Sequence, residues 1–197
     1  MVELRSLVRA PANMFSAADA LELVNAFDPG DDGLAAKSKD LTALLLRCTD
    51  AALSRDQYGP GHITGSALIL NPAGNRILVM HHHRHQRWLL PGGHVEEGDE
   101  TPDATARREA IEETGVMLAD SIGPLSGIDV HGIPGRKGEP YHLHHDLIFA
   151  FRAESEEFTC SQEAPRIAWC GLGEFARFAL PMNIVRSAER ARLLITA

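Results

Sequence analysis

Residues 92–116 read GGHVEEGDETPDATARREAIEETGV, and this stretch decides the fold and the chemistry that we expect of the chain. A glycine-rich loop leads into a predicted short helix. Thr101 suits the N-cap of this helix, Pro102 its first turn and Gly115 the position just after its end. With the start and the stop predicted, the side chains that share a face of the helix can be worked out.

Three glutamates fall on one face of this helix. Glu109, Glu112 and Glu113 stand at positions i, i+3 and i+4, which are neighbours on a helical surface. Like charges at this spacing destabilise a helix by about 0.2–0.5 kcal/mol per pair, and a divalent cation would reverse that sign. Carboxylate oxygens are the ligands that Mg²⁺ and Mn²⁺ prefer. A solvated helix face is the alternative, but the glycine loop and the helix signals around the glutamates favour a metal site.

The whole segment resembles the Nudix box, whose pattern is G-xxxxx-E-xxxxxxx-R-E-U-x-E-E-x-G-U, where U is aliphatic. The second half fits, from Arg108 to Val116, with a small Ala110 at the first aliphatic position. The first half departs from the pattern, because six residues rather than five separate Gly93 from Glu100. Asp99 would restore the spacing to the glycine but not the spacing to the arginine, so the roles of Asp99 and Glu100 stay open.

The resemblance implies a function, a metal and a set of residues. Nudix proteins hydrolyse a diphosphate linked to another moiety, commonly in a nucleoside diphosphate derivative, and they use Mg²⁺ or Mn²⁺. The implied metal ligands are three carboxylates and one main-chain carbonyl: Glu109, Glu112, Glu113 and Gly92. We expect Glu113 to have the largest single effect. Arg108 is expected to support the loop by pairing with a box carboxylate, Glu100.

The resemblance leaves the general base open, because family members take it from the box or from a later loop. Glu112 is the candidate within the box. Glu163, just before a predicted strand at residues 166–170, is the candidate outside it, and a surface carboxylate is the alternative interpretation there. The predicted catalytic set is therefore Glu109, Glu112, Glu113 and Glu163.

Histidines form the second unusual feature, since most of the ten lie in two clusters on either side of the box. On a strand, alternation places His142, His144 and Asp146 on one face and Leu143 and Leu147 on the other. Polar residues of this kind predict the lining of a substrate groove. The side chains expected to contact the phosphate or the base of the substrate are Arg84, Arg87, His131, His142 and His144. A polar face exposed to water is one alternative, and a transition-metal site of His131, His142 and His144 is another. The aromatic residues that could stack on a base are Trp88, Tyr141 and Phe149.

Composition limits the other possibilities. A net charge of −8 argues against a partner that is a nucleic acid polymer. No apolar run is long enough to span a bilayer, and the first residues do not resemble a signal peptide. The three cysteines, Cys48, Cys160 and Cys170, predict reduced and buried thiols in a cytoplasmic protein.

The order of predicted elements favours an α/β fold, and the resemblance implies an α/β/α sandwich with a mixed sheet. We expect helices at residues 16–27, 39–53, 173–178 and 182–196, besides the box helix. We place a helical N-terminal extension at residues 1–57 and a Nudix hydrolase domain at 61–197. The extension is expected to cap the sheet, and a contact between two copies in a homodimer is the alternative.

Two other functions compete with hydrolysis. One is a non-catalytic Nudix-fold sensor that binds a nucleotide, which the three intact box carboxylates disfavour. The other is an isomerase on a Nudix scaffold with a histidine-ligated metal, for which the cluster of His131, His142 and His144 is the sequence evidence.

Overall fold

A single mixed sheet forms the centre of the molecule in the computed structural model, which describes residues 14–82, 86–136, 138–160 and 165–195. In those residues the sheet has seven strands: β1 (His62–Leu70), β2 (Arg76–His82), β3 (Arg87–Leu89), β4 (Gly92–His94), β5 (Leu125–Ile133), β6 (His142–Arg152) and β7 (Arg166–Gly171). The main order is β3-β2-β1-β6-β5, while β4 also pairs with β1 and β7 with β2. Among the strands of the described residues, β1 and β6 alone pair in parallel, and the other pairs are antiparallel.

Alternation along the two central strands divides the apolar residues between two cores. Ile63, Ala67 and Ile69 of β1 join the first core, whereas Leu68 and Leu70 join the second. Because successive side chains of a strand point to opposite faces, this division requires helices on both faces of the sheet.

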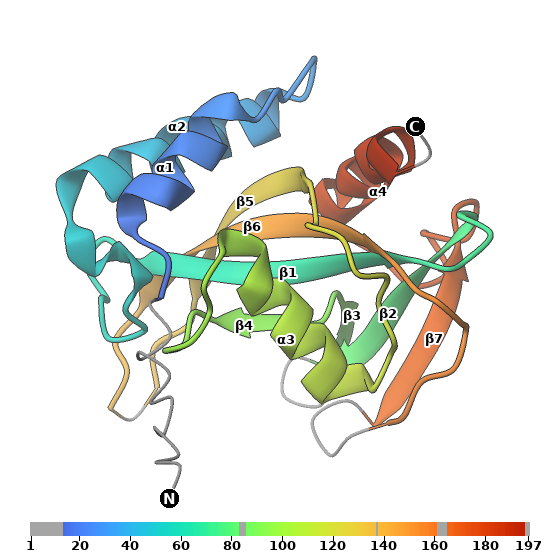
Figure 1. Cartoon of the computed structure of the whole chain (residues 1–197). Coiled ribbons are helices and arrows are strands. Elements are labelled where there is room, and N and C mark those ends of the chain that lie inside the picture. Colours follow the sequence, from blue (N-terminus) through green and yellow to red (C-terminus); the bar gives the residue numbers. More distant parts are fainter. Residues whose placement is uncertain (1–13, 83–85, 137, 161–164, 196–197) are drawn as a thin grey trace, which may run out of the picture.

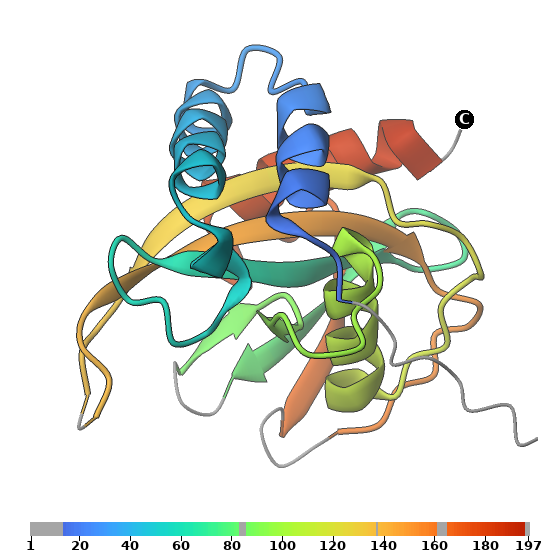
Figure 2. The same cartoon turned by 60° about the vertical axis from the view of Figure 1, so that its left-hand side comes forward.

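Helices cover the first core on one face and the second core on the other. The first contains α1 (Ala17–Ala26), α2 (Gly33–Cys48), a 3-10 turn at Asp50–Leu53 and α3 (Pro102–Thr114), and the second contains α4 (Met182–Ile195). Figure 1 shows α3 in front of β1 and β4, and Figure 2 shows α1 and α2 side by side over β5 and β6. The expected α/β/α sandwich with an N-terminal helical extension is confirmed.

The N-terminal helices follow the prediction only in part. The first is confirmed, with Ser16 as N-cap, but α2 begins at Gly33 rather than at residue 39, because Asp32 caps it. Helical spacing within residues 39–53 predicts Leu41 and Leu44 on the apolar side of that helix, but they are 50% and 56% exposed. The buried face instead carries small and polar residues beside its leucines: Ala35, Ser38, Thr42, Ala43, Leu45 and Leu46.

Two further predictions need correction. Residues 173–178 form turns rather than a helix. Cys48 and Cys160 are exposed, and only Cys170 is buried as expected, although all three are free thiols. None of the helices in the described residues is both long and apolar enough to cross a membrane.

Asp32 joins the N-terminal extension to α4. One carboxylate oxygen accepts the N–H of Ala35 at 3.1 Å and the other accepts Nη1 of Arg190 at 3.1 Å, while Nε of Arg190 donates to the carbonyl of Ser126 on β5 at 2.7 Å. This side chain is therefore both a helix cap and one half of a partly buried ion pair.

We predict that Asp32→Ala lowers the free energy of unfolding by about 1–2 kcal/mol, because the cap and the ion pair are both lost. Asp32→Asn is the matched control, since the amide oxygen still caps α2, and it should retain part of that free energy. Urea denaturation of both variants measures the difference. Equal losses in the two variants would contradict the capping role.

Candidate active site

The box helix α3 is held at the predicted bounds. It follows Thr101, has Pro102 in its first turn and ends at Gly115, whose φ of 63° lies in the left-handed region that glycine favours. The N–H of Gly115 donates to the carbonyl of Ile111 at 2.8 Å. Buried Ala106 and Ala110 pack α3 into the first core, and this fixes the direction of the glutamate face.

Two of the three box glutamates converge on the Gly92–Gly93 segment of β4. Oε2 of Glu113 accepts the N–H of Gly92 at 2.9 Å. A Cβ at Gly93 would overlap the carboxylate of Glu109, so only glycine allows that approach. Glu113 is buried, whereas the side chain of Glu112 is 58% exposed. The structure therefore places Glu109, Glu113 and Gly92 together and puts Glu112 at the rim.

Arg108 connects the carboxylates with the loop before the helix. Its Nη1 donates to Glu109 at 3.0 Å and to Glu112 at 3.3 Å, and its Nη2 donates to the carbonyl of His94 at 2.9 Å. Since Arg108 reaches both side chains and the end of β4, it holds the glutamate face against the strand.

The expected pair of Arg108 with Glu100 is wrong, because Asp99 takes that place. Nε and Nη2 of Arg108 donate to the two oxygens of Asp99 at 3.1 and 3.2 Å. Asp99 is 4% exposed, whereas Glu100 is exposed. The same carboxylate also accepts the N–H of Glu96 and the hydroxyl of Thr105. The carboxylate at the family's spacing from the glycine is thus the one that turns inward, and the extra residue displaces Glu100.

The pKa values of two carboxyl groups in the site are shifted in opposite directions, downward at Asp99 and upward at Glu109. Burial would raise the pKa of Asp99, but its hydrogen bonds, with Arg108 first, hold that pKa below its usual value. Burial raises the pKa of Glu109, and Glu112 and Glu96 add to this, although Arg108 opposes the shift. The positive charge of Arg108 therefore compensates the negative charges of the glutamates only in part.

This donor set fits a hard divalent cation. Carboxylate oxygens converge beside a glycine whose missing Cβ leaves room for Glu109, and the negative charge there is only partly compensated. Glu109, Glu112 and Glu113 are the side chains that would hold the ion, and Gly92 adds the main-chain oxygen that the resemblance implies.

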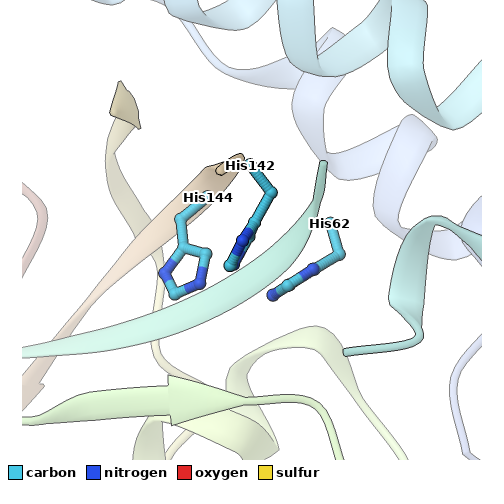
Figure 3. Close-up of side chains that lie close together, drawn as sticks. All are labelled: His62, His142 and His144. Carbon is cyan, nitrogen blue, oxygen red and sulfur yellow. The ribbon is translucent and has the colours of Figure 1, made fainter. Parts of the chain in front are cut away.

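Five histidines gather on the face of β1, β4, β5 and β6 opposite to α3. His62 lies in register with His144, and His144 in register with His131, so these rings share one face. The ring of His62 lies 4.8–5.1 Å from those of His94, His142 and His144. Figure 3 shows His62 from β1 beside His142 and His144 from β6.

The structure changes the membership of the predicted histidine group. The metal-binding atoms of His62, His142 and His144 lie within 4.8 Å of one another, whereas Nδ1 of His131 bonds to Asp129 at 2.9 Å. The prediction that His131 joins His142 and His144 is therefore wrong: His62 takes that place, and His131 lies at the edge of the group. His62 and His94 were missed, because each stands alone in the sequence.

Burial controls the charge of these rings. Burial and the neighbouring histidines lower the pKa of His94 to about 4 and that of His144 to about 2, and the pKa of His62 is also lowered. Burial opposes protonation of His131 as well, but Asp129 and Asp146 raise its pKa. The lowered pKa values of His62, His94 and His144 favour their neutral rings, whereas the raised pKa of His131 favours its protonated ring.

Asp146 extends the polar face toward the middle of the sheet. Thr64 and Ser66 donate to one of its oxygens at 2.9 and 3.0 Å, and its register partner on β5 is Asp129. Burial raises the pKa of the Asp146 carboxyl, although His131 and the two hydroxyls oppose that shift.

The remaining sequence candidates have different outcomes. Arg84 and Glu163 lie outside the described residues. Arg87 is exposed on β3, next to the partly buried Trp88. Phe149 is 1% exposed within the first core, so it is not available to stack on a base.

Comparison with known proteins identifies the family of the chain. The model of the NUDIX domain matches residues 61–190, so the chain belongs to that family. The box that suggested the family thus lies inside a match that spans all seven strands of the described residues and the first part of α4.

Two curated relatives are similar to part of this chain. The chain is 31% identical over 136 residues to an 8-oxo-(d)GTP phosphatase of Mycolicibacterium smegmatis, covering 67% of this chain and 38% of that protein. It is 34% identical over 97 residues to a probable DHNTP pyrophosphohydrolase of Lactococcus lactis subsp. cremoris, covering 48% of this chain and 56% of that protein. The chain therefore spans between about two fifths and just over half of the length of these relatives.

Among solved structures, a hydrolase of the NUDIX family from Clostridium perfringens has the same fold. Its TM-score is 0.50 at 24% identity, and the match covers 68% of this chain and 97% of that one. The class of enzyme that the box indicates, a Nudix hydrolase, agrees with the family and with the named relatives.

We predict that Asp99→Asn destabilises the loop before α3 by about 1.5–3 kcal/mol, because the buried Arg108 pair loses its charge. Glu100→Gln is the matched control and should be close to wild type, since Glu100 is exposed. Thermal and urea unfolding of the two variants measure the effect. A larger loss in Glu100→Gln than in Asp99→Asn would reverse the assignment.

We also predict that Gly93→Ala displaces the Glu109 carboxylate and weakens Mn²⁺ binding by more than about tenfold, because the position of a ligand depends on its supporting contacts. Gly138→Ala is the control, since a Cβ there meets no atom within 4 Å, although its φ of 90° costs some stability. Isothermal titration with Mn²⁺ measures the affinity. Unchanged affinity in Gly93→Ala would exclude Glu109 as a ligand.

Proposed function

We propose that the chain hydrolyses a diphosphate linkage in a nucleoside diphosphate derivative or a related small molecule, with water attacking phosphorus and Mg²⁺ or Mn²⁺ as the cofactor. The observation that carries this proposal is the convergence of the buried carboxylates of Glu109 and Glu113 on Gly92 and Gly93. When bound, the cation neutralises phosphate charge and lowers the pKa of a water ligand.

Each box residue has a separate task in this proposal. Glu109 and Glu113 supply the least exposed carboxylates, and the N–H of Gly92 keeps Glu113 turned toward β4. Arg108 positions Glu109 and Glu112 through its two Nη1 bonds and is itself fixed by Asp99. Arg108 donates hydrogen bonds to four groups: the side chains of Asp99, Glu109 and Glu112 and the carbonyl of His94. Because its donors are used in this way, its role is to position the glutamates rather than to bind phosphate.

Glu112 is the general base that the described residues favour. Its side chain is the most exposed of the three and retains access to water, yet Arg108 holds it beside the site. Glu163 stays the alternative base. Removal of a proton from water by Glu112 would complete the attack on phosphorus without any group from outside the box.

Relatives support the substrate class. One of the two relatives is named an 8-oxo-(d)GTP phosphatase and the other a probable DHNTP pyrophosphohydrolase. We extend this class to the present chain: a small nucleotide-like anion rather than a nucleic acid polymer. Arg84, Arg87, His131, His142 and His144 remain the proposed substrate-binding side chains. A cytoplasmic location, no membrane association and a homodimer belong to the same proposal.

The two competing functions have different support. A non-catalytic nucleotide sensor has no requirement for buried, convergent carboxylates, which are present here. An isomerase with a histidine-ligated metal is favoured only by the group of His62, His142 and His144. Hydrolysis is therefore the first function to test.

A screen of nucleotide and coenzyme diphosphates with Mg²⁺ or Mn²⁺, read as phosphate released after coupling to a phosphatase, tests the proposal. We expect turnover of at least one compound with the cation and none with excess chelator. Binding of a nucleotide without turnover of any compound would favour the sensor instead.

We predict that Glu113→Gln reduces this hydrolysis by more than about 100-fold with the fold intact, because the amide keeps the bond to Gly92 but loses the charge. Glu189→Gln, on the exposed surface of α4, is the matched control and should be unchanged. Steady-state kinetics and circular dichroism report activity and folding. Near wild-type turnover in Glu113→Gln would remove this residue from the metal site.

A further inference from the structure

We propose that His62, His142 and His144 form a second metal site, distinct from the box, that takes a borderline transition-metal ion such as Zn²⁺, Co²⁺ or Ni²⁺. The donor type separates the two sites. Three imidazoles with no carboxylate suit Zn²⁺, Co²⁺ or Ni²⁺, whereas the box offers the oxygens that Mg²⁺ and Mn²⁺ prefer. This inference goes beyond the proposed hydrolysis and does not rest on it; under it, His142 and His144 would meet a substrate through the bound ion rather than directly.

Strand pairing brings the three rings together. His62 opens β1 in register with His144 of β6, and His142 stands two residues earlier on the same face of β6. One ligand nitrogen from each ring lies within 4.8 Å of the other two (Figure 3). In a tetrahedral zinc site the nitrogens are about 3.3 Å apart, given zinc–nitrogen bonds of about 2.0–2.1 Å, so small ring rotations close the site.

Hydrogen bonds already orient two of the three rings. Nδ1 of His62 lies 3.2 Å from the carbonyl of Gln57, and Nδ1 of His142 lies 2.9 Å from the carbonyl of Pro140. A carbonyl only accepts, so each Nδ1 carries the proton and, in a neutral ring, Nε2 carries the lone pair. Metal-bound histidines are held in this way, by donation from the other ring nitrogen.

His62 supplies the strongest evidence that a ligand is required. The residue is 1% exposed, and its Nε2 is buried without a hydrogen-bond partner among the described residues. A buried polar atom left unpaired costs about 1–3 kcal/mol. Coordination by Nε2 would remove that cost, and it would also explain why several histidine rings are packed together at the end of two strands.

The position of the site relates it to the box without merging the two. The ring of His94 lies 5.1 Å from that of His62, and the carbonyl of His94 accepts Nη2 of Arg108. The histidines lie on the face of β1 and β4 opposite to α3, whose glutamates approach Gly93. Three protein ligands leave one tetrahedral position, which a water or a substrate oxygen can fill.

Metal analysis of the whole 197-residue chain tests the proposal. The protein is stripped with a chelator and then titrated with Zn²⁺, and separately with Co²⁺, in excess Mg²⁺ so that the box is saturated. We expect one Zn²⁺ per chain to remain after dialysis, and Co²⁺ to give the visible absorption of a tetrahedral nitrogen-ligated ion. No retained Zn²⁺ in the wild type would overturn the site.

Matched variants separate this site from the others. His142→Gln and His144→Gln should lose Zn²⁺ affinity by more than about 100-fold, because each removes one of three ligands. His81→Gln, a histidine of β2 outside the group, and Glu113→Gln in the box should retain it. Equal loss in Glu113→Gln would place the ion in the box and contradict the proposal.

The melting temperature, measured with and without Zn²⁺, distinguishes the loss of the metal site from a loss of folding in a variant. Zn²⁺ should raise the melting temperature of the wild type and of His81→Gln, because a ligand that binds the native state stabilises it. The same addition should leave the melting temperatures of His142→Gln and His144→Gln unchanged. An equal rise in all four proteins would show binding elsewhere and would overturn the proposal.

Discussion

The parallel pairing of β1 with β6 is the contact on which both parts of the candidate site depend. Nine residues of β1, from His62 to Leu70, lie in register with His144 to Arg152. This register buries alternate residues in the two cores, and it also places His62 beside His144 and Thr64 beside Asp146. A shift by one residue would turn every one of these side chains to the other face.

Burial on both sides of the sheet is what makes that register secure. The first core fixes α3 through Ala106 and Ala110, and the second fixes α4 through Ala188 and Ala191. Because α3 packs closely on the sheet, its glutamate face points toward the glycines of β4. The box geometry is thus a consequence of packing, whereas Arg108 and Asp99 only adjust it.

The sequence predicted the box helix and the strand faces well, because their caps and alternation are local, but it missed the equally local cap of α2 at Asp32 and expected a helix at residues 173–178, where the chain forms turns. The bounds of α3, the faces of β6 and the sandwich all agree with the structure. Other predictions failed where contacts between segments distant in the sequence determine the position of a side chain. Asp99 replaced Glu100 because of loop length, and Leu41 and Leu44 turned outward because α2 meets β5 through smaller residues. His62 joined the histidine group only through non-local pairing, which no spacing in the sequence reveals.

The central claim is that water attacks phosphorus at the box, and hydrolysis in heavy-oxygen water tests it most directly. Once a substrate is known, its products can be analysed by mass spectrometry after turnover with Mg²⁺. Our account predicts one heavy oxygen in a phosphate group of the product. Heavy oxygen found only in a carbon-bound hydroxyl of a product, with none in any phosphate group, would show cleavage of a carbon–oxygen bond and would contradict attack on phosphorus.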